Sequence, residues 1–164
     1  MKIPINTLNW LLTYCLYSGL VLGATPSIMA QQTTPTGSPA ATRGAATYFS
    51  GTVWVATLVG PNAETDCLVS SVTFDPKART FWHTHPNGQL LVVTKGTGYY
   101  QEKGKPARVI REGESVTIPP LVEHWHGAGP DGPFTHIAIN PNVSQGGAVN
   151  WLQAVTDADY DAAR

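Results

Sequence analysis

The sequence predicts an all-β fold, a sandwich or barrel of about nine short strands. Two observations carry this prediction. Short apolar runs rich in Val, Thr and Trp follow one another along the chain, and turn-forming residues separate them. The 164 residues include 13 prolines and 16 glycines, which favour turns and strands over long helices. A closed barrel or a double-sheet jelly roll would also leave few strand edges exposed.

The first four predicted strands end at clear turn signals. They cover residues 52–59, 67–74, 79–85 and 89–95. The turns after them contain Gly60-Pro61-Asn62, Asp75-Pro76, Pro86-Asn87-Gly88 and Gly96, in that order. Proline and glycine supply the backbone angles that tight turns need.

The remaining predicted elements are shorter. Strands are expected at residues 99–102, 107–110, 115–118, 124–126 and 134–140. The segment Lys103-Gly104-Lys105-Pro106 suggests a hairpin between the first two of these. Residues 157–163 are expected to form a short C-terminal helix, with Thr156 or Asp157 as its cap.

The N-terminal segment has the pattern of a secretory signal peptide, predicted as residues 1–30. Lys2 supplies a positive charge, residues 8–24 are largely apolar, and Ala30 is a plausible cleavage position. The mature protein is then expected to be periplasmic or secreted, with no membrane contact after cleavage. The alternative is an uncleaved anchor, for which the apolar stretch is somewhat short.

Residues 31–46 are rich in Gln, Thr, Pro, Ser, Ala and Gly and are predicted to be a flexible linker. The folded domain is predicted at residues 47–164. Cys67 would be the only cysteine of the mature chain, so no intrachain disulfide can form. We expect a buried structural thiol there. The formal net charge of −1, with no block of like charges, argues against a nucleic-acid-binding surface.

Five histidines make up the whole histidine content of the chain, and all lie between residues 83 and 136. His83 and His85 are two residues apart, so their side chains share one face if residues 81–85 are extended. Imidazole is the commonest protein ligand for metals, and a side-chain amide oxygen such as that of Gln89 can join it. A metal site is therefore the first hypothesis.

The spacing of these residues resembles the two motifs of the cupin family. His83-x-His85, three residues, Gln89, six residues and Gly96 follow the first motif, and Gly113, Pro119 and His124 follow the second. The departures are Lys77 and Leu121 at glycine positions, Gln89 at the usual glutamate position and Ala128 at the usual asparagine position. The resemblance implies a double-sheet jelly-roll barrel around a metal. It also implies the ligands His83, His85, Gln89 and His124, although metal-free family members exist.

Glutamine in place of glutamate changes the charge of such a centre. Three neutral histidines and a neutral amide leave a divalent ion with its full charge, so it should bind an anion more strongly and be a stronger Lewis acid. Nitrogen and oxygen ligands with open positions suit Mn(II), our first choice, or Fe(II). Zn(II) and Ni(II) are further alternatives.

A closer resemblance exists to the small bacterial manganese cupins that act as hydroxynitrile lyases. The segments that carry it are residues 79–86, 124–128 and 135–138. In that group glutamine is the expected ligand. Its activity splits a cyanohydrin into an aldehyde and cyanide, or runs in reverse. By this resemblance the chain is expected to be a metal-dependent lyase on a small-molecule substrate.

The same resemblance suggests roles for five further residues. His126 and His136 are the predicted catalytic acid/base residues, with His136 acting toward the substrate hydroxyl and His126 on the cyanide side. Ser70, Val72 and Asn140 are predicted to bind the substrate. The alternatives are core packing for Ser70 and Val72, a strand-end turn residue for Asn140, and a loop-ordering residue at the barrel mouth for His126.

Two other functions use the same ligands and remain open. One is a metal-dependent dioxygenase or other oxidoreductase, and the other is a non-catalytic cupin that binds a small ligand. The several polar groups near the metal favour an enzyme. Small cupins commonly pair into dimers or tetramers, so a homo-oligomer is expected.

Overall fold

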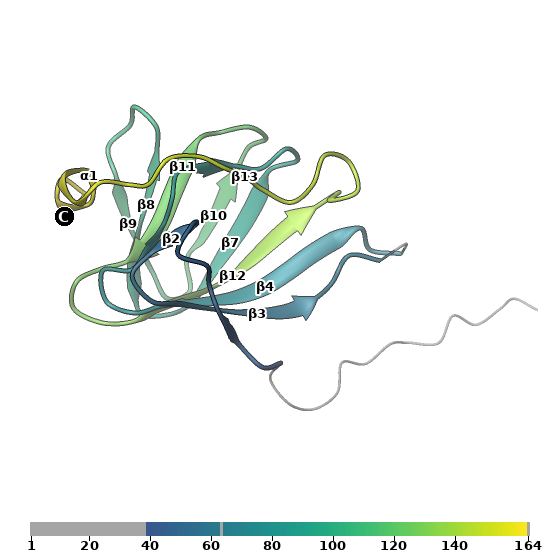
Figure 1. The fold of residues 1–164 in the computed structure, drawn as a ribbon, viewed down its shortest axis with the longest axis horizontal. Helices are drawn as coiled ribbons and strands as arrows, with labels where there is room; N and C mark the ends of the chain where they lie inside the picture. Colours follow the sequence, from purple (N-terminus) through teal and green to yellow (C-terminus); the bar gives the residue numbers. More distant parts are fainter. Residues whose placement is uncertain (1–38, 63, 164) are drawn as a thin grey trace, which may run out of the picture. The chain divides into compact units, whose positions relative to one another are not determined.

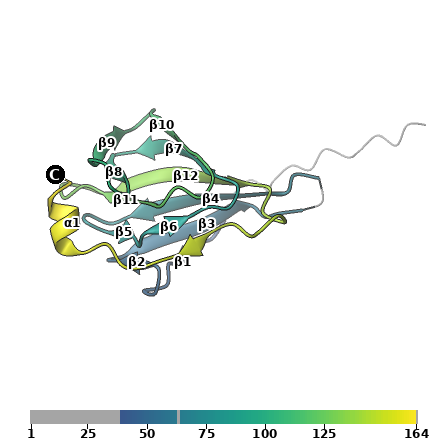
Figure 2. The same cartoon turned by 90° about the horizontal axis from the view of Figure 1, so that it is seen from above.

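The protein was described from a computed structural model, which covers residues 39–62 and 64–163. Two curled antiparallel sheets face each other and enclose the core (Figures 1 and 2). The first sheet has the strand order β1 (Thr42–Arg43), β3 (Val53–Val59), β4 (Cys67–Phe74), β12 (Phe134–Pro141), β7 (Gln89–Lys95) and β10 (Ser115–Ile118). The architecture is the predicted jelly-roll barrel.

The second sheet carries most of the histidines. Its order is β13 (Asn150–Trp151), β6 (His83–Thr84), β11 (His124–Ala128), β5 (Arg79–Thr80) and β2 (Phe49–Ser50). β8 (Thr97–Glu102) pairs with β11 and also with β9 (Arg108–Arg111), as the predicted hairpin requires.

The predicted strand 79–85 is interrupted in the structure. β5 and β6 are separated at Phe81 and Trp82, because the backbone of Trp82 pairs with the C-terminal segment instead of a neighbouring strand. Its N–H donates to the carbonyl of Gln153 at 2.9 Å, and its own carbonyl accepts from Leu152 at 2.9 Å. His85 therefore lies just beyond the end of β6 rather than inside one continuous strand.

The predicted boundaries near the N-terminus are only partly within the described residues. The signal peptide at 1–30, and the first part of the linker at 31–46, lie outside them and stay predictions, as does export. Thr42–Arg43, inside the predicted linker, pair with β3 as β1, so ordered structure begins before residue 47. Over the part of the chain that the structure describes, no helix has the length and apolar character needed to cross a membrane.

The inward side chains of β4, β12 and β7 change from apolar to polar along the barrel. Phe74 and Phe134 are register partners with no exposed surface and form the apolar end. Further along β12, every second residue is buried, which places His136 next to these phenylalanines and Asn140 at the other end. The barrel thus has an apolar floor and a polar upper chamber.

The C-terminal helix α1 (Asp157–Asp161) lies at one end of the barrel, and the loop of residues 142–149 lies toward the other (Figure 1). Thr156 caps the helix by accepting from the backbone N–H of Asp159 at 3.0 Å. Arg79 binds Asp157 at 2.6 Å and the carbonyl of Val155 at 3.0 Å, which fastens the end of the chain to β5.

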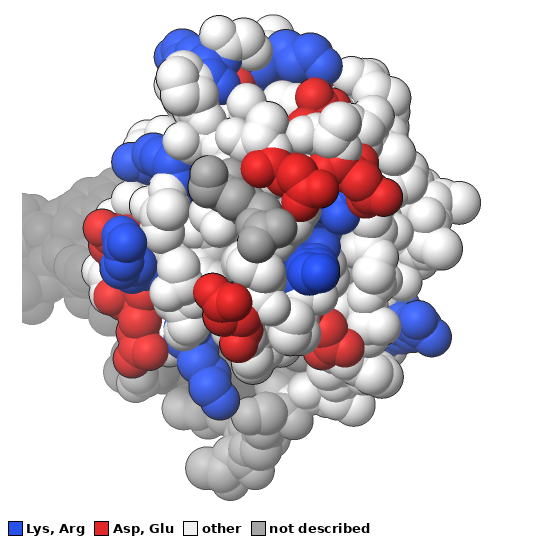
Figure 3. Space-filling view, turned by 90° about the vertical axis from the view of Figure 1, so that its left-hand side faces the viewer, with Lys and Arg blue, Asp and Glu red and all other residues white. Residues whose placement is uncertain are grey.

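Acidic and basic side chains are interspersed on the face drawn in Figure 3. Lys103 pairs with Glu123 at 3.3 Å and Lys105 with Glu102 at 2.5 Å. This surface has the mixed charge expected from a formal net charge of −1.

Cys67 is partly exposed rather than buried as predicted, because it lies at the first position of β4.

Candidate metal centre

Three histidines from two paired segments converge inside the barrel. His83 in β6 lies directly opposite His124 in β11, and His85 follows two residues later. One ring nitrogen from each of the three lies within 4.8 Å of those of the other two. The predicted ligand histidines are therefore brought together, as the motif spacing requires.

Each of these rings donates its Nδ1–H to a backbone carbonyl. The acceptors are Phe81 for His83 at 2.9 Å, Val122 for His124 at 2.9 Å and Ala148 for His85 at 2.5 Å. A carbonyl has no proton to give, so Nδ1 must carry the hydrogen in all three rings. In the neutral ring this leaves Nε2 with a free lone pair, which is the form that binds a metal.

The fourth predicted ligand, Gln89, lines the same cavity as His83 and His85. The Gln89 side chain donates from Nε2 to Oδ1 of Asn140 at 3.1 Å, which leaves the side-chain carbonyl oxygen Oε1 free to bind a metal.

Gly88 precedes Gln89 and has a φ of 79°, and a side chain at this position would meet the carbonyl of Ile118 at 2.7 Å. The tight turn between His85 and Gln89 therefore needs glycine.

Burial keeps the three histidines neutral. It lowers the pKa of His83 well below its ordinary value, with a further lowering from His124 and His85 nearby. Burial likewise lowers the pKa of His124 to about 4 and that of His85 below its usual range. Neutral imidazole is the metal-binding form, so the site is prepared for a cation rather than for protons.

The unsatisfied atoms of the site test whether a metal fits. Among the described residues, three buried atoms of this cluster have no hydrogen-bond partner, namely His85 Nε2, His124 Nε2 and Gln89 Oε1. A buried polar atom without a partner costs about 1–3 kcal/mol. All three are lone-pair donors, and a divalent cation would satisfy them together. The predicted set of His83, His85, Gln89 and His124 therefore fits a metal ion.

Two further histidines form a pair beside this cluster. His136 Nε2 and His126 Nδ1 are 3.2 Å apart, and the His83 and His126 ring centroids are 5.3 Å apart. Burial lowers the pKa of His136 to about 3 and that of His126 well below its ordinary value, in His126 with help from His136. Within the described residues the outer nitrogens, His126 Nε2 and His136 Nδ1, have no hydrogen-bond partner.

A cavity of about 130 Å³ opens beside the metal ligands. The predicted substrate residues Ser70, Val72 and Asn140 line it, together with His126 and His136. Cavities of roughly 150 Å³ in proteins hold a molecule the size of benzene. The chamber therefore suits a small ligand with an apolar part.

Several lining residues were not predicted from the sequence. Apolar side chains complete the wall, from Phe49, Val55, Leu68, Ala138, Val149 and Trp151. The rings of Phe49 and Trp151 pack edge to face, with their centroids 5.5 Å apart. The ring centroids of Trp151 and His83 are 4.9 Å apart. Alternation within β3 and β4 could have indicated Val55 and Leu68, but no local pattern marks Trp151.

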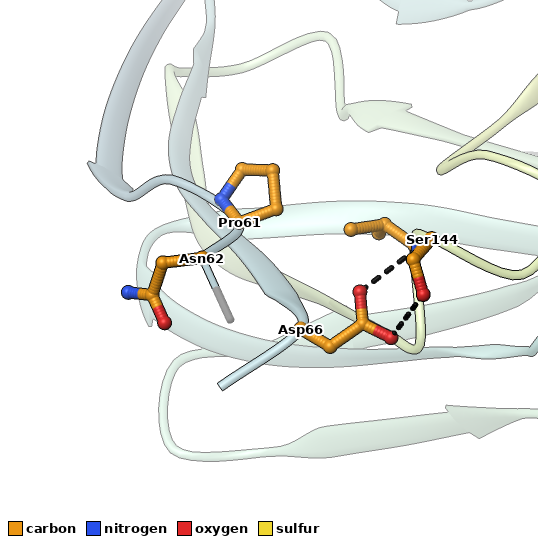
Figure 4. Close-up of a pocket in the computed structure, with 5 residues that line it drawn as sticks. Pro61, Asn62, Asp66 and Ser144 are labelled. Atoms are coloured by element: carbon orange, nitrogen blue, oxygen red, sulfur yellow. Dashed lines mark hydrogen bonds between the residues drawn. The ribbon is translucent and has the colours of Figure 1, made fainter. Parts of the chain in front are cut away.

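The loop of residues 142–149 carries the Ala148 carbonyl that holds His85. Asp66 anchors this loop, accepting from the N–H of Ser144 at 2.9 Å and from its hydroxyl at 2.7 Å (Figure 4). Asn87 adds two bonds, to the carbonyls of Asn142 at 2.8 Å and Gln145 at 2.9 Å. The hollow between Pro61 and Ser144 in Figure 4 is thus bordered by a structural clamp, because both carboxylate oxygens of Asp66 are engaged.

The two glycine positions of the motifs that differ here have a structural explanation. Lys77 has a φ of 67° and Leu121 a φ of 62°, both in the left-handed region that favours glycine. The turns are therefore kept despite the substitutions, at some cost in backbone strain.

Comparisons with known proteins agree with this geometry. The cupin domain profile matches residues 70–140, which include all the predicted ligands. A protein named (R)-mandelonitrile lyase from Granulicella tundricola is 45% identical over 126 residues, covering 76% of this chain and 94% of that protein.

Two solved structures share this fold. A cupin-like protein from Thermotoga maritima is 48% identical, with a TM-score of 0.71, covering 74% of this chain and 91% of its own. A cupin-2 domain from Rhodospirillum rubrum shares the fold at 19% identity and a TM-score of 0.54, covering 80% of this chain and 84% of its own. With its barrel, its motif residues and these relatives, the chain belongs to the cupin family.

Proposed function

We propose that this protein is a metal-dependent lyase that cleaves or forms small cyanohydrins, exchanging an aldehyde and cyanide for the adduct. The observation that carries the proposal is the buried His126–His136 pair beside the three-histidine cluster. The 45% identical relative named (R)-mandelonitrile lyase supports the choice of reaction.

The ligand set is proposed to hold Mn(II), with Fe(II), Zn(II) and Ni(II) as alternatives. When bound among three imidazoles and an amide, the ion would supply positive charge that stabilises an anion in the chamber. His83, His85, Gln89 and His124 would hold it.

The histidine pair can move a proton without gaining or losing one. His136 Nδ1 accepts the hydroxyl proton of the cyanohydrin as the bond between the carbinol and nitrile carbons breaks. His136 Nε2 passes its proton to His126 Nδ1 across their 3.2 Å contact, and His126 Nε2 releases a proton to the departing cyanide. The electron pair of the broken bond leaves with cyanide, so the products are aldehyde and hydrogen cyanide and the pair ends with as many protons as it began.

The walls of the chamber suit the remainder of such a substrate. Phe49, Val55, Val72 and Trp151 surround it with apolar surface, whereas Ser70 and Asn140 supply polar atoms. A cyanohydrin with one aromatic ring combines the same two characters. Enclosure by apolar side chains also strengthens the electrostatic interactions of the histidine pair.

The decisive experiment combines metal analysis with an activity screen. The purified domain is analysed for bound metal and then assayed on mandelonitrile for benzaldehyde and cyanide, under nitrogen and under air. We expect turnover under both gases, and His136→Ala should lower it by about 10²–10⁴-fold while metal content stays unchanged.

The matched control is Ile137→Val, at the neighbouring outward position of β12, which should keep full turnover. Full activity of metal-loaded His136→Ala would overturn the assigned proton route. Turnover that requires oxygen would replace the lyase with an oxygenase.

A further inference from the structure

Asn140 makes a buried contact whose consequence extends to the metal site. It lies near the end of β12, is 6% exposed, and accepts through Oδ1 from Nε2 of Gln89 at 3.1 Å. Both residues also line the chamber. The two amides thus form one hydrogen-bonded unit in the wall of the chamber, beside His83 and His85.

An amide side chain can present either its oxygen or its nitrogen to a neighbour. Only the oxygen of Gln89 can bind a cation, because the amide nitrogen carries protons and no available lone pair. The opposite orientation would aim an N–H₂ group at the lone pairs of His85 and His124 and would provide no fourth ligand. With Asn140 Oδ1 as the acceptor, the bond holds Gln89 in the orientation in which Oε1 is left for the metal.

The same bond decides what Asn140 offers to a bound molecule. Its Oδ1 already accepts from Gln89, whereas its N–H₂ group makes none of the side-chain hydrogen bonds found among the described residues and can donate to a bound molecule. An N–H₂ group only donates, and it pairs with an acceptor such as a nitrile or cyanide nitrogen, an azide or a carboxylate.

We propose that Asn140 is a positioning residue that turns Gln89 Oε1 toward the metal and thereby presents its own N–H₂ to an acceptor atom of the ligand. This inference rests on the proposed metal centre but not on which reaction the centre performs. It assigns one residue two linked roles, one in metal affinity and one in anion binding.

Two variants at residue 140 separate the roles. Asn140→Asp keeps an acceptor for Gln89 Nε2 but removes the donor and adds negative charge. Asn140→Leu removes both. Outer-shell partners of metal ligands typically contribute about 10–100-fold to metal affinity. We expect Asn140→Leu to lose Mn(II) affinity in this range, and Asn140→Asp to bind Mn(II) at least as tightly as the unaltered chain.

Azide binding to the Mn(II)-loaded protein, followed by electron paramagnetic resonance, is the second readout. Both variants should bind azide at least about 10-fold more weakly than the unaltered protein, since one good bidentate or charge-assisted hydrogen bond is worth about that factor. Full azide affinity in Asn140→Asp would overturn the donor role.

A double-variant cycle tests whether Asn140 acts through Gln89. If it does, adding Asn140→Leu to Gln89→Ala should cause no further loss of Mn(II) affinity. Additive losses, or normal Mn(II) affinity in Asn140→Leu alone, would overturn the positioning role. Thermal unfolding of the metal-free variants checks that each one is folded. If the unaltered protein binds no metal at all, the proposed function fails instead, so the two failures are distinguishable.

Discussion

The proposed metal ligands of this barrel fall into two groups that are held in place in different ways. His83 and His124 each donate to the carbonyl two residues earlier in their own segment, those of Phe81 and Val122. His85 instead relies on Ala148, 63 residues further along, and Gln89 on Asn140, 51 residues away. One half of the site is therefore prepared by local backbone, and the other half depends on distant segments.

The difference indicates where the metal affinity can be tuned. His83 and His124, which are held by local backbone, also lie opposite each other on two adjacent strands, because they are register partners. Its geometry persists as long as β6 and β11 pair. The distant braces pass through the 142–149 loop and the end of β12, so changes outside the barrel core can alter His85 and Gln89 without unfolding it. Four predictions test this comparison.

The largest effect should come from removing a locally braced ligand. His124→Ala deletes one of the predicted ligands themselves, so Mn(II) affinity should fall by more than the roughly 10–100-fold typical of losing an outer partner. Metal content after dialysis is the measurement. The matched control is His126→Ala, two residues along the same strand, which should retain its metal. Equal metal loss in both variants would show that His126 is a ligand.

Removing the metal should also be visible in stability. A ligand at 100 times its dissociation constant stabilises the folded state by about 2.7 kcal/mol. Chelation should therefore lower the unfolding temperature of the unaltered protein, and Mn(II) should restore it. His124→Ala should show no such response. Identical unfolding curves with and without metal would mean that the cluster does not bind it.

A smaller effect is expected from loosening the distant brace. Ser144→Ala removes the hydroxyl bond to Asp66 at the outer edge of the loop and so weakens the placement of the Ala148 carbonyl. Mn(II) affinity should fall by about 10-fold or less, near the lower limit for an outer partner. Asp131→Ala, an exposed change in another loop, serves as the control. Unchanged affinity in Ser144→Ala would show that Ala148 holds His85 without help from the clamp.

The smallest effect concerns backbone strain next to His85. Leu121 has a φ of 62° and is 66% exposed, and its N–H donates to the His85 carbonyl at 2.9 Å. Leu121→Gly relieves about 1–2 kcal/mol of strain but adds unfolded-chain entropy, so we expect a gain of about 0.5 kcal/mol in the free energy of unfolding. Urea unfolding measures it against Leu121→Ala, which keeps the strain. A glycine variant less stable than the alanine variant would contradict this account.

Much of the fold could be predicted because its signals are local. The bounds of β4, β7 and β10 agree with the predicted strands, since turn residues and alternation mark each end. The break between β5 and β6 could not be predicted, because it results from the pairing of Trp82 with residues near the end of the chain.

The site divides along the same line. By itself the sequence predicted a sandwich or barrel of short strands and a shared face for His83 and His85, because turn residues and two-residue alternation are local signals. The resemblance to the cupin motifs added the jelly-roll barrel, which the structure confirms, and the ligand set His83, His85, Gln89 and His124, of which the structure brings the three histidines together. Only the tertiary structure decided that the Ala148 carbonyl accepts from His85, that Asn140 accepts from Gln89 and that Trp151 lines the chamber. The His85–Ala148 and Gln89–Asn140 contacts join residues more than 50 positions apart in the sequence, and Ala148 lies in an irregular loop whose path no periodic pattern encodes.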